Sequence, residues 1–327
     1  MNIYICGKTD IGIERANNED AFSFCSDLNK SNWADSTSNG YIRNGELGSI
    51  SIVADGMGGA NAGEIASSIA IESIKSDLAP SLLSEVIDSD EKIKNYLSKI
   101  ILNANNAILK YIESDPNTIG MGSTIVLIWI LNEKAYIAWC GDSRCYVFNP
   151  KQGLKCLSKD HSYVQELIDK GEITVKQSFN HPDSSIITRC LGDCDTSAEP
   201  EILVYKIHKH DQFLLCSDGL CGYCNDKIIE KTFYKEYLNV DKCCNAMIDL
   251  ALKTGGQDNI SVINISTIGD NELEIPYSLN GKIKRWVSSF LVWISVKISN
   301  SKEEKFLINY TSKISSKKFD FSVERFC

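Results

Sequence analysis

Short strand-like runs dominate the first two-thirds of the chain, and helices do not separate them in regular alternation. Residues 124–131 and 135–140 flank the polar turn Asn132-Glu133-Lys134, which predicts an antiparallel hairpin. Further strands are predicted over residues 49–54, 145–148, 212–216 and 261–265. Strands joined in this way favour antiparallel sheets over a regular βαβ fold.

Three segments carry apolar residues at helical spacing. One stripe runs from Ile65 to Leu78, a second runs from Ile93 to Tyr111, and residues 241–253 form the third. Long helices together with hairpins predict an α+β fold in which helices cover antiparallel sheets. Residues 29–45 are rich in Ser, Asn and Gly, which predicts a loop insertion.

The C-terminal part differs from the rest of the chain. No clear linker precedes residue 267, so we expect one domain over residues 1–268 and an extension over residues 269–327. Apolar residues at helical spacing beside Lys and Arg predict an amphipathic helix near 282–298, with an apolar core shorter than the about 20 residues that span a bilayer. Such a helix packs on its own domain, docks on a protein or lies on an anionic membrane surface.

Composition and missing motifs narrow the function. The net charge of −9 argues against nucleic acid as a partner, because phosphate backbones select basic surfaces. The 13 cysteines do not form two C-x-x-C motifs of the kind that together hold a metal, and no signal peptide is evident, so we expect free thiols in the cytoplasm. The sequence has no P-loop, no H-E-x-x-H, no G-x-S-x-G and no C-x₅-R motif.

Aspartates stand at the ends of several predicted strands. Two apolar runs end in Asp-Gly, a third aspartate lies in a tight connection between strands, and a fourth precedes a strand. These residues are Asp55, Asp218, Asp142 and Asp258. A single Asp-Gly pair is also an ordinary turn signal. Four such aspartates together indicate a hard-cation site, because Mg²⁺ and Mn²⁺ prefer carboxylate oxygen and water.

An arginine precedes two acidic residues near the N-terminus, in the order Arg15, Glu19 and Asp20. A guanidinium can hold a phosphate through two hydrogen bonds and keeps its charge, although an arginine beside acids also forms ordinary surface ion pairs. His161 follows Asp160 at a predicted strand end, where a catalytic role and a hydrogen-bonded structural role are both open.

In this order, these segments resemble the type 2C protein phosphatases, the metal-dependent Ser/Thr family, and especially its compact bacterial members. The matching stretches are residues 9–12, 15–21, 54–59, 62–64, 120–124, 141–144, 157–162, 187–192, 215–220 and 256–261. The resemblance covers roughly residues 3–267. It implies an α+β fold, a four-layer α-β-β-α sandwich with two central antiparallel sheets, and a metal cluster at one end of the sandwich.

The resemblance also implies a set of site residues. The metal ligands carried over from the family are Glu19, Asp20, Asp55, Gly56, Asp142, Asp218 and Asp258. Asp55 would bridge two Mn²⁺ or Mg²⁺ ions, Glu19 or Asp20 would act through water, and Asp142 would help to bind a third, weaker ion. Arg15 would bind the substrate phosphate, and the expected catalytic residues are Arg15, Asp55 and Asp218.

The implied reaction is hydrolysis of phosphoserine or phosphothreonine in a protein. A hydroxide between the two cations would attack phosphorus, without a covalent phosphoenzyme. The expected partners are phosphorylated proteins and a cognate Ser/Thr kinase that the enzyme opposes. Met57 stands where many eukaryotic relatives have a histidine, so no general acid is assigned. Residues 159–185 correspond to a mobile flap beside the active site in bacterial relatives.

Two other functions are weighed against this reading. A catalytically silent family member would act as a regulatory binding module, but the four strand-end aspartates and Arg15 are all present. An unrelated metal hydrolase such as a nuclease would need a basic groove, and the acidic body of the chain argues against one.

Overall fold

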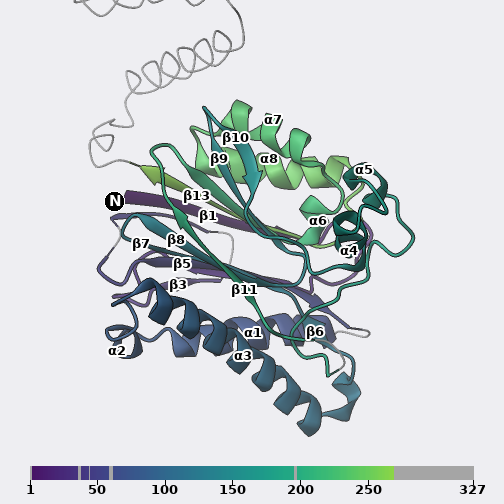
Figure 1. The fold of residues 1–327 in the computed structure, drawn as a ribbon, viewed down its shortest axis with the longest axis horizontal. Helices are drawn as coiled ribbons and strands as arrows, with labels where there is room; N and C mark the ends of the chain where they lie inside the picture. The colour runs from purple at the N-terminus through teal and green to yellow at the C-terminus, as the bar shows by residue number, and fades with distance from the viewer. Residues whose placement is uncertain (1, 36–37, 44, 59–61, 195–196, 269–327) are drawn as a thin grey trace, which may run out of the picture. The chain divides into compact units, whose positions relative to one another are not determined.

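Two antiparallel β-sheets form the centre of the molecule, with helices on both outer faces (Figure 1). The computed structural model describes residues 2–35, 38–43, 45–58, 62–194 and 197–268. Its strands are β1 (Asn2–Asp10), β2 (Asp20–Cys25), β3 (Trp33–Ala34), β4 (Ser38–Arg43), β5 (Ser49–Met57), β6 (Gly122–Ser123), β7 (Ile125–Leu131), β8 (Lys134–Cys140), β9 (Arg144–Asn149), β10 (Gly153–Cys156), β11 (Glu201–Lys206), β12 (Gln212–Cys216) and β13 (Ile260–Ile268). Its helices are α1 (Ala62–Asp77), α2 (Pro80–Leu83), α3 (Asp90–Ser114), the 3₁₀ helix η1 (Pro116–Thr118), α4 (Tyr163–Asp169), α5 (Val175–Ser178), α6 (Asp218–Cys221), α7 (Asp226–Glu236) and α8 (Val240–Lys253).

The order of the strands confirms the predicted antiparallel pairing. One sheet has six strands in the order β10-β9-β12-β13-β1-β4, and the other has seven, β11-β8-β7-β5-β2-β3 with β6 paired to β5. The predicted hairpin is formed by β7 and β8, in which Ile125 pairs with Cys140 and Leu131 with Lys134. Asn132 takes a positive φ of 55° in the turn, a conformation that asparagine tolerates better than most residues.

The helices add one layer to each side of the two sheets. In Figure 1, α1 and α3 lie below the seven-stranded sheet, and α7 and α8 lie above the six-stranded sheet. Ser89 caps α3 by accepting a hydrogen bond from the backbone N–H of Lys92, and the apolar stripe of that helix is buried against the sheet side. The predicted four-layer α-β-β-α sandwich is therefore confirmed.

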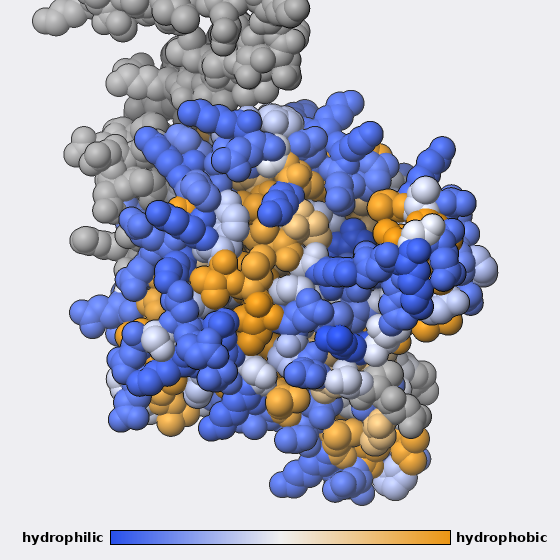
Figure 2. All heavy atoms as spheres, in the orientation of Figure 1, coloured by the Kyte–Doolittle hydropathy of each residue, from blue (hydrophilic) through white to orange (hydrophobic). Residues whose placement is uncertain are grey.

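Three apolar cores separate the four layers. Between the sheets, Phe213 and Ile263 of the six-stranded sheet pack in one cluster with Ile128 of the other. A second core lies under α1 and α3, and a third lies under α7 and α8. Figure 2 shows a mainly hydrophilic outer face around an apolar band, which crosses the region where Figure 1 draws the strands. Burial of these cores fixes the strand ends that carry the acidic residues.

The prediction of a loop insertion over residues 29–45 was wrong. Two short strands, β3 and β4, lie within it. β4 pairs with β1 at the edge of the six-stranded sheet, and β3 pairs with the end of β2. Edge strands are held by backbone pairing on one side, so a polar, Ser- and Asn-rich composition does not exclude them.

Two further predictions concern the C-terminal part. The extension over residues 269–327, with its amphipathic helix near 282–298, lies outside the described residues, and the boundary at residue 268 stays a prediction. Among the residues that the structure describes, no helix is both long enough and apolar enough to cross a membrane.

Candidate active site

Five aspartates come together at one end of the sandwich, and we call them the aspartate cluster. Asp20 opens β2 and pairs in register with Asp55 near the end of β5. Asp218 opens α6 directly after β12, Asp142 lies between β8 and β9, and Asp258 precedes β13. This end of the molecule carries the labels α6 and β6 in Figure 1. Strand ends from both sheets thus deliver carboxylates to one place.

Burial and mutual repulsion raise the pKa of these carboxyl groups. Burial raises the pKa of Asp55 well above its usual range, and the charges of Asp20 and Asp218 add to the effect. Burial and the charge of Asp258 raise the pKa of Asp218 to about 6. Burial also raises the pKa of Asp20 to about 7, against the opposing hydrogen bond from Ser217. The cluster is therefore a region where positive charge would be strongly stabilised.

Two carboxylate oxygens of the cluster show what kind of group fits there. Within the described part of the chain, Asp20 Oδ1 and Asp142 Oδ1 are buried and accept no hydrogen bond. Buried carboxylate oxygens without a partner are costly, and an all-oxygen donor set suits a hard divalent cation. Among the described residues, no three His, Cys, Asp or Glu side chains are arranged so that they alone could hold a metal ion. Mg²⁺ keeps several waters and uses one or two carboxylates, so the cluster fits hydrated ions.

Arg15 reaches the cluster through an ion pair. Its Nη2 donates to Oδ2 of Asp258 at 2.7 Å, while 49% of the Arg15 side chain stays exposed. The hydrogen bond to Asp258 is the main cause that raises the pKa of Arg15, and the charges of Glu19 and Asp218 add to it. Burial raises the pKa of Glu19, which the Arg15 charge opposes. The predicted phosphate ligand and Glu19 therefore lie at the rim of the aspartate cluster.

The glycines of the two Asp-Gly pairs are needed for close backbone approach. A Cβ on Gly56 would collide with the carbonyl oxygen of Gly63, and one on Gly219 would collide with that of Asn259. The backbone N–H of Gly56 also donates to the carbonyl of Glu19 at 3.2 Å. Gly56 thus brings β5, the start of α1 and the N-terminal loop together at the cluster.

Asn259 is a positioning residue that the sequence pattern does not reveal. Its buried side-chain amide donates to the carbonyls of Ile11 and Asn17, each at 2.9 Å, and its Oδ1 accepts from the N–H of Glu19 at 2.8 Å. One side chain therefore ties the N-terminal loop to the start of β13. Its place directly after an aspartate at a strand start is the only signal in the sequence.

Two hydroxyl groups also orient the cluster. Ser217 Oγ donates to Asp20 Oδ2 at 2.7 Å and accepts from the N–H of Ser261 at 2.9 Å. Thr124 Oγ1 accepts from the N–H of Asp55 at 3.2 Å. These contacts join β12, β13, β2 and β5 at the point where the carboxylates meet. A preceding serine next to Asp-Gly is too common a pattern to predict such a role.

His161 takes the hydrogen-bonded structural role. Its Nδ1 accepts from the N–H of Gly141 at 3.1 Å, and its Nε2 lies 3.2 Å from Oε1 of Glu201. The Gly141 contact places the ring proton on Nε2, and burial lowers the pKa of His161. The ring supports the turn that carries Asp142. Met57 ends β5 in pairing with Gly122, and its thioether has no proton to donate.

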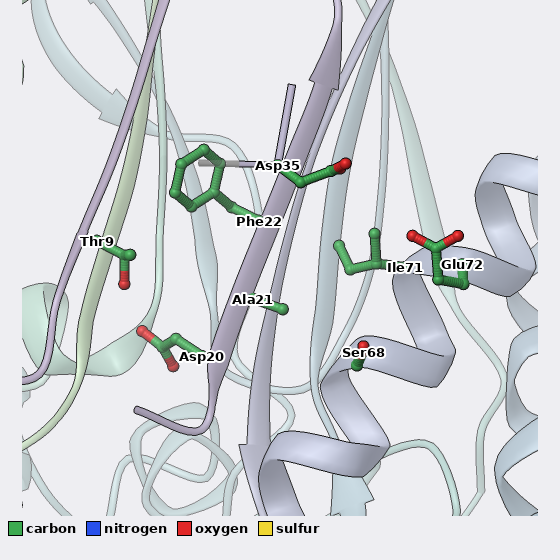
Figure 3. Close-up of a pocket in the computed structure, with 8 residues that line it drawn as sticks. All are labelled: Thr9, Asp20, Ala21, Phe22, Asp35, Ser68, Ile71 and Glu72. Carbon is green, nitrogen blue, oxygen red and sulfur yellow. The ribbon is translucent and has the colours of Figure 1, made fainter. Parts of the chain in front are cut away.

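Asp20 also lines a cavity of about 210 Å³ beside β2 (Figure 3). Thr9 and Asp20 border it on one side, and Ser68 and Glu72 of α1 border it on the other. The acid Asp35 closes its far end. The cavity therefore adjoins the aspartate cluster at the open edge of β2.

Comparison with known proteins shows the family and the fold of the chain. A sequence model of the family described as Protein phosphatase 2C matches residues 14–260. The serine/threonine phosphatase stp of Listeria monocytogenes is 34% identical over 224 residues, which cover 68% of this chain and 86% of that protein. The structure of the S. agalactiae serine/threonine phosphatase has a TM-score of 0.69 at 29% identity and covers 81% of this chain and 100% of that chain.

A further solved structure bears on the cofactor. It is the catalytic domain of the serine threonine protein phosphatase PstP in complex with two manganese ions, with a TM-score of 0.65 at 27% identity, covering 82% of this chain and 100% of that chain. The oxygen donors assembled here suit the same kind of ion. With three-quarters of its length matched by the family pattern and its fold shared with solved members, the chain belongs to the protein phosphatase 2C family.

Proposed function

We propose that in this metal-dependent protein serine/threonine phosphatase the aspartate cluster holds two Mn²⁺ or Mg²⁺ ions and Arg15 holds the substrate phosphate. Asp55 lies at the centre of the cluster, because the charges of the other four aspartates all act on it. In this proposal the Asp55 carboxylate would hold both ions, and the Gly56 carbonyl would contribute to one of them. Asp218 and Asp258 would complete the ligands of the second ion, and Glu19 or Asp20 would contribute through water.

The observation that carries the proposal is the meeting of five part-buried or buried aspartates from different strand ends, two of them with unpartnered oxygens among the described residues. Burying like charges together is unfavourable unless something compensates them. A divalent cation is the compensating group that suits oxygen donors and a phosphate substrate. Asp142, beside the charges of Asp218 and Asp160, would help to bind a third, weaker ion.

When bound, the ions supply a lowered pKa for coordinated water and neutralise charge on the phosphoryl oxygens. The protein residues do the rest. Arg15 keeps its charge at all relevant pH values and is placed by its ion pair with Asp258 to orient the phosphate beside the cluster. Ser217 holds Asp20 in a fixed orientation through its 2.7 Å hydrogen bond. The carboxylates of Asp218 and Asp55 supply the negative charge that would compensate the positive charge of the ions.

The flap over residues 159–185 controls substrate access in this proposal. It contains α4 and α5, and its base is fixed by hydrogen bonds from Tyr163 N to Ile186 O at 2.9 Å and from Thr188 N to His161 O at 2.8 Å. The base thus rests on His161, which also contacts the Gly141 turn. Movement of the flap would therefore start beyond this base, at α4 and α5.

The cellular setting belongs to the same proposal. The substrates are proteins phosphorylated by a cognate Ser/Thr kinase, which the phosphatase opposes. The cysteines within the described residues form no disulfide, which supports action in the reducing cytoplasm. The C-terminal extension, predicted to carry a helix near 282–298, docks the enzyme on a protein or on a membrane surface.

Phosphate release from a phosphothreonine peptide tests this function. The wild type, Asp218→Asn and the surface control Asp88→Asn are compared in EDTA, Mg²⁺ and Mn²⁺. We expect release that requires a metal and falls sharply only in Asp218→Asn, because Asp88 is exposed and pairs with the surface residue Lys92. No turnover by well-folded, metal-loaded wild type would instead support a silent regulatory module.

A further inference from the structure

Two large apolar side chains stand exposed beside Arg15, and we call them the apolar rim. Ile13 is 67% exposed, and Tyr223 is 38% exposed. Single exposed apolar residues are ordinary on a protein surface, so exposure alone carries little weight. Here, however, both lie near the residue proposed to hold the phosphate: Ile13 is two residues before Arg15 in the chain, and the charge of Arg15 acts on Tyr223.

Ile13 is held rigidly in its exposed position. Its backbone N–H donates to the carbonyl of Gly256 at 2.6 Å, and the N–H of Glu14 donates to the same oxygen at 3.3 Å. The side chain lies directly against Gly256, where an added Cβ would come within 2.9 Å of Ile13 Cγ1. Two hydrogen bonds from Asn259 to the carbonyls of Ile11 and Asn17 fix the rest of the loop. The loop therefore does not bury this isoleucine by folding back.

Tyr223 approaches the same point from α6. It follows Gly222, the residue that caps α6, and the charges of Asp218, Asp258 and Arg15 all act on its phenol. The next residue, Cys224, contacts Thr254 Oγ1 through its thiol at 3.3 Å. That contact joins the Tyr223 segment to the turn on which Ile13 rests. Both members of the rim are thus on segments that are joined to the turn at residues 254–256.

We propose that the apolar rim is a substrate subsite, which takes an apolar side chain two positions away from the phosphorylated residue of a polypeptide substrate. The proposal rests on the proposed role of Arg15 as the phosphate ligand. Alternate side chains of an extended peptide share one face and are spaced by about 6.6 Å. Ile13 and Arg15 are two residues apart, so their Cα atoms are separated by at most about 7 Å. A peptide whose phosphate lies at Arg15 can therefore place that side chain over Ile13.

Two matched pairs of phosphothreonine peptides test the subsite. One pair carries Leu or Ser two positions before the phosphothreonine, and the other carries Leu or Ser two positions after it. We expect the Mn²⁺-loaded wild type to prefer the Leu peptide of at least one pair by about tenfold in kcat/KM, the low end of what one apolar contact contributes to specificity. Ile13→Ser should remove the preference, Tyr223→Ser should reduce it, and Ile13→Leu should keep it.

Leu82→Ser is the matched control. Leu82 is an aliphatic residue that is 50% exposed on α2, at the opposite end of the lower helical layer from β6 in Figure 1, so this variant should keep the wild-type preference. Equal rates on both members of both pairs, or a preference that survives in Ile13→Ser, would overturn the subsite. Failure of the wild type to hydrolyse p-nitrophenyl phosphate and all four peptides would instead overturn the proposed function. Hydrolysis of all of them without any preference would overturn the proposed subsite and leave the proposed function standing.

Discussion

Two charged clusters lie side by side inside this protein, and their partners differ. In the paired cluster, Arg144 donates to both oxygens of Asp160 at 2.7 and 2.6 Å and to the hydroxyl of Tyr146 at 3.0 Å. In the aspartate cluster, like charges face one another, and among the described residues Asp20 and Asp142 each have a buried oxygen that accepts no hydrogen bond. The charge of Asp160 acts on Asp142, so the two clusters are neighbours.

The difference separates a structural role from a functional one. A buried ion pair whose hydrogen bonds are made within the protein is complete, and removing one partner leaves an uncompensated charge. A group of buried carboxylates that repel one another is incomplete until a cation arrives. Removing a charge from the paired cluster should therefore damage the fold, whereas removing one from the aspartate cluster should damage activity and spare the fold.

The largest expected effect is on stability, for Arg144→Met. This variant leaves the part-buried carboxylate of Asp160 without its partner, so we expect the free energy of unfolding to fall by about 3 kcal/mol, the low end of the loss for a buried pair. Urea denaturation followed by circular dichroism measures it. Asp226→Asn is the control, because Asp226 lies 3.8 Å from Arg144 and is half-exposed, and it should change stability by less than about 1 kcal/mol. A loss below about 1 kcal/mol for Arg144→Met would erase the distinction between the clusters.

Asp218→Asn should show the reverse pattern. We expect kcat/KM on a phosphothreonine peptide to fall by about 10²–10³-fold, as when one electrostatic group is removed from an active site. In EDTA, the variant should be at least as stable as the wild type, because one repelling charge has gone. If the variant unfolds more easily than the wild type in EDTA, Asp218 stabilises the fold, as Arg144 and Asp160 do.

The pH dependence of stability sharpens the comparison further. The pKa values of Asp20 and Asp218 are raised to about 7 and about 6 in the folded protein, from 3.8. Between pH 3.8 and these raised pKa values, the folded state holds protons that the unfolded state releases. The stability of the metal-free protein should therefore be greatest near pH 4 and fall as the pH rises to 7. The fall is at most about 1.4 kcal/mol per pH unit for each proton.

Mn²⁺ should reverse this pH dependence, because it binds the deprotonated carboxylates of the folded state. Thermal unfolding between pH 4 and 7.5, with EDTA and with Mn²⁺, provides the measurement. Parallel curves under the two conditions would mean that the ions bind elsewhere.

Ser217→Ala should give the smallest effect. It removes the hydrogen bond that orients Asp20, and loss of such a supporting contact typically weakens metal affinity by about tenfold. Titration calorimetry with Mn²⁺ measures the change. Ser114→Ala is a suitable control, since that exposed hydroxyl donates to the Tyr111 carbonyl within the last turn of α3. Equal Mn²⁺ affinity in Ser217→Ala and the wild type would show that Ser217 does not support metal binding.

Much of the fold is readable from the sequence where side-chain pattern and burial agree. The hairpin of β7 and β8, the strand β12 and the helices α1, α3 and α8 all carry regular apolar patterns, and each forms close to its predicted place. The strands β1, β2 and β11 and the helix α7 were not predicted. β1 mixes polar and apolar residues, and β11 is only half-buried, so pairing with distant strands decides their structure.

Some residues of the site can also be predicted from the sequence, and others cannot. The aspartates at strand ends are visible because an apolar run stops at each of them. Asn259 and Ser217 are not visible, because their partners lie up to 248 residues away in the chain, and no local pattern marks such contacts. The rim residue Ile13 has no local signal either, since its exposure is fixed by the fold of the loop around it.

Mn²⁺ binding by the wild type and Asp55→Asn, measured by titration calorimetry at neutral pH, tests the central claim most directly. The wild-type chain should bind two ions with high affinity, besides the weaker third one, and Asp55→Asn, which lacks the carboxylate proposed to hold both, should lose at least one of the two while its fold is retained. Unchanged stoichiometry and affinity in Asp55→Asn would contradict the assignment of the aspartate cluster as the metal site.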